Sequence, residues 1–216
     1  MVRLPKSFWL IAPFATWMVL MTVLPATVGG YAVRTTATAA LLAAGWRQGL
    51  KTLDDRRETD LPSNVLSPLT SLVSRLKSSL LPGLLVGLAV FAIWILPEQF
   101  DWAWYRRFCI IGEGGTQAVA EASAVMIAIR LVGSAFVISV AEELFFRKWL
   151  IGFAGFWPMV ALFAVEHDRW LVAAICGIAY GWLYLRRGLG AAIVAHATTN
   201  LVLGLWILKT GQWQFW

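Results

Sequence analysis

The sequence predicts an all-α fold: a polytopic bundle of transmembrane helices with about seven to eight spans. Of its 216 residues 59% are apolar and only 14% are charged, whereas soluble domains carry about 25% charged residues. Several apolar windows reach the roughly 20 residues that a helix needs to cross a bilayer. The 13 tryptophans agree with this, because indole rings favour the membrane interface.

Seven apolar segments are the expected spans, and nothing between them suggests a second domain. We therefore treat residues 1–216 as one integral membrane domain. In chain order the expected spans are 8–28, 31–46, 80–96, 119–141 continuing towards 151, 156–166, 170–185 and 189–208. The first apolar stretch is longer than that of a signal peptide and no A-x-A site follows it, which favours an uncleaved span. The glycine pairs Gly83/Gly87 and Gly177/Gly181 predict close helix packing.

The largest segment between spans is 47–79, which begins as a polar connector of mixed charge. It continues into SPLTSLVSRLKSSL, where Ser67 suits an N-cap and Pro68 suits the first helical position. Apolar residues then recur at helical spacing at Leu69, Leu72, Val73, Leu76 and Leu80. The pattern predicts an amphipathic interfacial helix on the membrane surface.

Basic residues in the short connectors predict the orientation of the chain. Arg3/Lys6, the 47–79 connector, Arg147/Lys148 and Arg186/Arg187 fall on one side if every span crosses once. The positive-inside rule makes that side cytoplasmic. We expect a multi-pass protein of the cell inner (plasma) membrane with a cytoplasmic N-terminus.

Composition also argues against two functional classes. The net charge of +6 comes from connectors rather than from one basic face, so we expect no nucleic-acid partner. Cys109 and Cys176 are isolated, so they predict neither a disulfide framework nor a metal cluster.

The stretch AEELFFRKWL, residues 141–150, carries the first candidate functional residues. Glu143 and Arg147 are four residues apart and therefore share a helix face on which they can pair. Glu142 points about 100° away and is left free to act as a base. The alternative is that Arg147 and Lys148 simply mark the cytoplasmic end of a span. An acid within a membrane is nevertheless costly, which favours a functional role.

Two histidines, the only ones in the chain, complete the candidate set. FAVEH ends at His167 with Phe163 one turn earlier, and HATTN runs from His196 to Asn200 on one helix face. A carboxylate, two imidazoles and an amide can activate water and stabilise an oxyanion. Counting from the basic ends, all could meet in the cytoplasmic half of the bilayer. The polar EHDR stretch at 166–169 predicts a helix break or a water-filled cavity.

These motifs resemble a known family. EELFFR fits E-E-x-x-x-R, FAVEH fits F-x-x-x-H and HATTN fits H-x-x-x-N, in order within 142–200. This is similar to the CAAX prenyl protease type II (CPBP, abortive-infection) family of intramembrane glutamic proteases. The resemblance implies that Glu142 and His167 activate water, that His196 and Asn200 form the oxyanion hole, and that Glu143 and Arg147 support the site. The C-terminal segment further resembles the CAAX prenyl protease-related branch that accompanies bacterial exosortase systems.

The expected activity is therefore that of a metal-independent endopeptidase without a cofactor. The implied partners are a membrane-anchored or lipidated protein substrate in the lipid bilayer, and exosortase-system proteins. Three alternatives remain open. Glu142, His167 and His196 would suit a zinc protease, although H-E-x-x-H is absent. The chain could instead be a non-catalytic membrane scaffold. A proton-coupled transporter is the third, although no repeated halves are visible.

Overall fold

The computed structural model describes residues 4–48, 79–111 and 123–215, and every regular element among them is a helix. This confirms the all-α prediction. The expected amphipathic helix at 67–80 falls almost entirely outside the described residues. The helices in the first half are α1 (Lys6–Val23), α2 (Val28–Arg47), α4 (Leu81–Gln99) and α5 (Ala103–Cys109). In the second half α9 (Phe156–Val165), α10 (Trp170–Arg187), α11 (Leu189–Thr210) and the short η6 (Trp213–Phe215) follow one long helix.

The long helix, Ala124–Ala154, joins the two halves. It consists of α6 (Ala124–Val132), η4 (Gly133–Ile138), α7 (Ser139–Glu142), η5 (Glu143–Leu150) and α8 (Ile151–Ala154), of which η4 and η5 are π-helical. Four described helices are long and apolar enough to cross a membrane: α1, α4, the long helix and α11. Helix α9 is apolar but shorter. The structure thus supports a helical membrane bundle.

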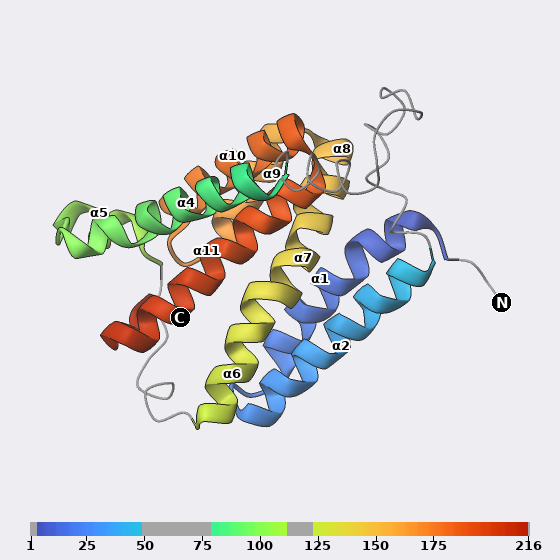
Figure 1. Cartoon of the computed structure of the whole chain (residues 1–216), viewed down its shortest axis with the longest axis horizontal. Helices are drawn as coiled ribbons and strands as arrows, with labels where there is room; N and C mark the ends of the chain where they lie inside the picture. Colours follow the sequence, from blue (N-terminus) through green and yellow to red (C-terminus); the bar gives the residue numbers. More distant parts are fainter. Residues whose placement is uncertain (1–3, 49–78, 112–122, 216) are drawn as a thin grey trace, which may run out of the picture.

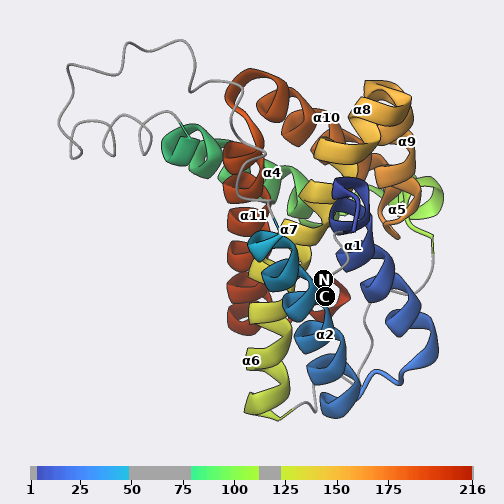
Figure 2. The same cartoon turned by 90° about the vertical axis from the view of Figure 1, so that its right-hand side faces the viewer.

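The helices form two groups that meet at the long helix (Figures 1 and 2). Helices α1 and α2 pack together as an antiparallel pair, and both contact the long helix. On its other side, α11 contacts the long helix and lies along α4, while α9 packs on α10. The long helix is therefore placed between the groups, with residues of α7 and η5 facing α1 and α11.

Close contact between α4 and α11 depends on two glycines. A Cβ on Gly83 would lie 2.9 Å from the carbonyl oxygen of Ala191, and one on Gly87 would lie 2.5 Å from that of Ala195. These distances leave no room for a side chain. The predicted close packing at Gly83/Gly87 is confirmed, and it brings the turn of α11 that carries His196 against α4.

Two sharp turns place α9, α10 and α11 around the site. Gly155 and Gly188 have φ values of 97° and 89°, a conformation that residues other than glycine rarely adopt. They separate α8 from α9 and α10 from α11. Residues 166–169 form the turn between α9 and α10, so the helix break expected at EHDR is present. That turn carries Glu166 and His167 towards the long helix.

One expectation about the long helix is wrong. Arg147 does not mark a solvated helix end, because the helix continues to Ala154 and the Arg147 side chain is fully buried. Glu142 consequently lies 12 residues, or about 18 Å, before the end of the helix. The charged residues are part of the packed interior.

Candidate active site

A buried network of three charged or polar side chains lies at the centre of the bundle. Arg147 Nη1 is 3.1 Å from Glu143 Oε1, and both side chains are 0% exposed. The Nδ1–H of His196 donates to the same Glu143 oxygen at 2.9 Å. The pairing of Glu143 with Arg147 was predicted from their spacing, whereas the contact with His196 was not. Glu143 thus connects the long helix to α11.

Glu142 has a different environment from its neighbour. It is 6% exposed, and its Oε2 atom is buried without a hydrogen-bond partner among the described residues. The nearest basic atom that forms a pair with it is Nε2 of His196, at 3.8 Å from Oε2. The carboxylate of Glu142 is therefore held close to an imidazole but still has an unused acceptor, as a general base for a water molecule would require.

His167 is oriented by its own helix end. Its Nδ1 lies 2.8 Å from the carbonyl oxygen of Phe163. A carbonyl can only accept, so Nδ1 carries the proton and Nε2 keeps a free lone pair. Burial lowers the pKa of His167 to about 4, although the bond to Phe163 acts in the opposite direction. The imidazole is therefore neutral at pH 7 and able to accept a hydrogen bond at Nε2.

Aromatic rings fix the positions of these polar groups. The Arg147 guanidinium lies over the Phe163 ring at 4.3 Å, and the Phe163 ring is 4.6 Å from that of His167. His196 stacks on Tyr180 at 5.0 Å. The Tyr180 hydroxyl donates to Thr199 Oγ1 at 2.7 Å. Phe163 thus contacts both Arg147 and His167, while the contact of Tyr180 on α10 with His196 was missed because no motif marks it.

Asn200 makes contacts that the sequence did not predict. Its Nδ2 donates to the Ser134 carbonyl oxygen at 3.0 Å and to Ser139 Oγ at 3.1 Å. Ser139 Oγ donates to the same carbonyl at 2.9 Å. These bonds connect α11 to the N-terminal end of the π-helical segment η4 and to the first residue of α7, one turn before Glu142. In this arrangement both amide protons of Asn200 are used, so it could serve an oxyanion only by exchanging one of them.

A third carboxylate, absent from the predicted set, joins Glu142 and Glu143 at the site. Glu166 lies in the α9–α10 turn, and its Oε2 is 3.3 Å from His167 Nδ1. One ligand atom from each of Glu142, Glu166 and His167 lies within 4.8 Å of the others, a spacing that could hold a metal ion. The zinc alternative had named His196 as the third ligand; the three ligand atoms that lie together come instead from Glu142, Glu166 and His167, while His196 Nε2 lies 3.8 Å from Glu142 Oε2. Only the identity of Glu166, directly before His167, could have suggested this cluster.

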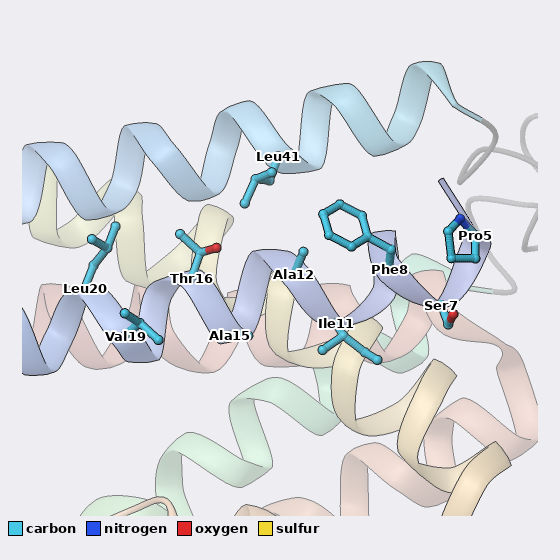
Figure 3. Close-up of a pocket in the computed structure, with 10 residues that line it drawn as sticks. All are labelled: Pro5, Ser7, Phe8, Ile11, Ala12, Ala15, Thr16, Val19, Leu20 and Leu41. Atoms are coloured by element: carbon cyan, nitrogen blue, oxygen red, sulfur yellow. The ribbon is translucent and has the colours of Figure 1, made fainter. Parts of the chain in front are cut away.

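An apolar groove lies apart from these residues. Figure 3 shows it along the face of α1 between Pro5 and Leu20, with Leu41 of α2 at its edge. Its lining residues are Pro5, Ser7, Phe8, Ile11, Ala12, Ala15, Thr16, Val19, Leu20 and Leu41. It contains no candidate catalytic residue. The chemistry of the chain is thus concentrated where the long helix, the α9–α10 turn and α11 meet.

Comparison with known proteins agrees with this location. Residues 123–202 match the family model described as Type II CAAX prenyl endopeptidase Rce1-like. The matched range contains all seven residues proposed from the sequence motifs, and it confirms the resemblance to that family. Neither the curated proteins nor the solved structures contain a significant match.

Proposed function

We propose that this chain is an intramembrane endopeptidase of the glutamic type, starting from the match of residues 123–202 to the family model described as Type II CAAX prenyl endopeptidase Rce1-like. The family match supports a membrane protease of the CAAX type. The observation that carries the finer proposal is the unpartnered, buried carboxylate oxygen of Glu142 beside two imidazoles. The reaction is hydrolysis of a peptide bond without a metal ion or cofactor.

Water activation is assigned to Glu142 and His167. The two come from different elements, and a carboxylate oxygen of Glu142 lies within 4.8 Å of a ring nitrogen of His167, a spacing that one water molecule can bridge. As the water oxygen attacks the carbonyl carbon, its proton passes to the Glu142 carboxylate. The lone pair on Nε2 of His167 accepts a hydrogen bond from the water and orients it. The protonated Glu142 then returns the proton to the leaving amine nitrogen as the C–N bond breaks.

Oxyanion stabilisation is assigned to His196 and Asn200. The Glu143 carboxylate accepts the Nδ1–H of His196 at 2.9 Å, so it would stabilise a positive imidazolium that donates from Nε2 to the oxyanion. Asn200 would provide a second donor by exchanging its bond to Ser139 for one to the substrate. Preorganised donors of this kind are each worth about 10²–10³ in rate. Glu143, Arg147 and Phe163 hold these groups in position.

The substrate is a membrane-anchored or lipidated protein, because the site lies within helices that are apolar enough to be embedded. We place the protein in the inner membrane, with a cytoplasmic N-terminus and the site open to the cytoplasmic half of the bilayer. Exosortase-system proteins are the proposed neighbours, on the resemblance of the C-terminal segment.

The test is Glu142→Gln, which keeps the size of the side chain but removes the base. We expect peptide hydrolysis by the purified protein in chelator to fall at least about 100-fold, the usual contribution of a general base. Asp168→Asn is the matched control, since Asp168 is an exposed acid in the α9–α10 turn. The membrane peptidomes of cells carrying each variant would identify the substrate. Wild-type processing by a normally expressed Glu142→Gln protein would refute the assignment.

A further inference from the structure

Glu142, Glu166 and His167 form a cluster that the proposed hydrolysis uses only in part. We propose that the cluster is a binding site for a transition-metal dication such as Zn²⁺, and that the bound ion inhibits the peptidase. The ligand atoms come from two elements, α7 and the α9–α10 turn, and lie within 4.8 Å of one another. The inhibitory part of this inference rests on the proposed function.

His167 has the hydrogen bonding of a metal-binding histidine. Metal-binding histidines almost always donate their second ring N–H to a carboxylate or a carbonyl, which fixes the tautomer. Here Nδ1–H donates to the Phe163 carbonyl oxygen at 2.8 Å, and Glu166 Oε2 lies 3.3 Å from the same nitrogen. The lone pair of Nε2 is left for an electrophile. A water molecule or a dication can take that place.

The two carboxylates each have an acceptor atom that no described group satisfies. Oε2 of Glu142 and Oε2 of Glu166 are both buried without a hydrogen-bond partner, and Glu142 is more than nine-tenths buried. Arg147, the nearby fixed cation, is paired with Glu143 instead. Unsatisfied carboxylate oxygens at one buried position are costly, and a dication would compensate both charges, although the Glu166 side chain as a whole is 18% exposed.

The donor set favours zinc over the hard cations. Two carboxylate oxygens and one imidazole nitrogen match the His/Glu ligands of zinc sites with three protein ligands. Mg²⁺ and Ca²⁺ prefer six or more oxygen ligands. Around a tetrahedral zinc with bonds of about 2.1 Å, ligand atoms lie about 3.4 Å apart. Ligand atoms that now lie up to 4.8 Å apart must therefore move closer by at most about 1.4 Å to bind zinc. Rotation of the side chains can supply this movement.

Inhibition follows from which groups the ion would occupy. A cation bound to Glu142 and to Nε2 of His167 removes the two acceptors that the hydrolytic water needs. The ion would also hold the α9–α10 turn against α7. Glu166 is the residue that separates the two functions, because it belongs to the proposed ion site and has no assigned step in hydrolysis.

The experiment uses the full-length protein purified in detergent and stripped of metal with a chelator. Zinc binding is measured by equilibrium dialysis for wild type, Glu166→Gln and Asp168→Asn. Peptide hydrolysis is then followed as Zn²⁺ is added, each variant being normalised to its own rate in chelator. We expect one zinc per chain, inhibition of wild type, and an affinity at least about 10-fold weaker in Glu166→Gln. Asp168→Asn should match wild type in both measurements.

The other outcomes separate this proposal from the hydrolytic one. Equal zinc affinity in wild type and Glu166→Gln would overturn the ion site, whatever the activity. Activity that requires zinc and disappears in chelator would overturn inhibition and also the metal-independent mechanism. The protein could also bind zinc as expected but hydrolyse no peptide in either chelator or zinc. That result would refute the inhibition and the proposed hydrolysis, while the ion site would stand.

Discussion

Replacing Arg147 with methionine would leave a buried carboxylate without its cation. The Arg147 side chain is 0% exposed, lies 3.1 Å from Glu143 Oε1 and stacks on the ring of Phe163. Methionine is a flexible apolar chain that fills much of the same space. The substitution therefore tests the charge more than the volume. Among the described residues, the contact left to the Glu143 carboxylate would be that with His196.

The expected loss of stability can be worked from this geometry. Two unit charges 3.1 Å apart attract by about 5 kcal/mol at an effective dielectric constant of about 20. Removing one partner of a buried pair typically costs about 3–5 kcal/mol, because the other charge stays buried. We expect Arg147→Met to lower the free energy of unfolding by about 3–5 kcal/mol.

Unfolding in mixed SDS–detergent micelles, followed by tryptophan fluorescence, provides the assay. Arg187→Met is the matched control, because Arg187 is exposed at the end of α10 and should change stability by less than about 0.5 kcal/mol. In the double variant Glu143→Gln/Arg147→Met the unpaired charge is absent. That protein should therefore be more stable than Arg147→Met alone.

Two results would refute the reasoning. A loss below about 1 kcal/mol in Arg147→Met would mean that the ion pair contributes no more than an exposed one. A double variant as unstable as the sum of the single changes would mean that Glu143 and Arg147 do not interact energetically.

Three further predictions concern other parts of the site. Gly87→Ala should lower the free energy of unfolding by about 1–3 kcal/mol, because its Cβ would meet an α11 carbonyl oxygen at 2.5 Å. Gly152→Ala is the control, since no atom lies within 4 Å of the added Cβ and no loss of stability is expected. Equal unfolding curves for the two variants would contradict this. Asn200→Ala should lower the free energy of unfolding by about 1–3 kcal/mol and slow hydrolysis, since its bonds to Ser134 of η4 and Ser139 of α7 are lost. Ser139→Ala, assayed alongside, should have a smaller effect, and the reverse order would argue against a structural role of the Asn200 amide. For His167 the folded pKa of about 4 lies below the unfolded value of about 6.5. In chelator, the contribution of the neutral His167 ring to the free energy of unfolding should be fully present above about pH 6.5 and fall as the pH approaches 4. Unfolding measured at several pH values should show a shallower dependence of this free energy on pH in His167→Gln than in wild type. Equal slopes would count against a His167 ring held neutral by the fold.

Local spacing was sufficient to predict some features of the site. The pair Glu143/Arg147 follows from four-residue spacing, and it is present at 3.1 Å. The helix break at 166–169 follows from four consecutive polar residues between apolar segments, and the turn is present. Each of these depends only on residues near one another in the chain.

Contacts between distant segments could not be predicted in the same way. His196 and Glu143 are 53 residues apart, and nothing in either motif states that they touch. The burial of Arg147 was missed for a related reason: an arginine near the end of an apolar run resembles a helix flank until its partners are known. The π-helical segments also lack a compositional signal, because a single wider turn changes hydrogen bonding rather than hydropathy.

The position of Arg147 within the long helix bears on how the protein enters the membrane. A lone arginine or aspartate in the middle of an inserting helix costs about 2.5–3.5 kcal/mol. Glu143 and Arg147 lie four residues apart on one helix, so they can neutralise each other as soon as that helix forms, without any contribution from a later segment. His196, on α11, arrives more than 40 residues later. The long helix can thus insert into the membrane with its ion pair already formed. The site is complete only after α11 has packed against that helix.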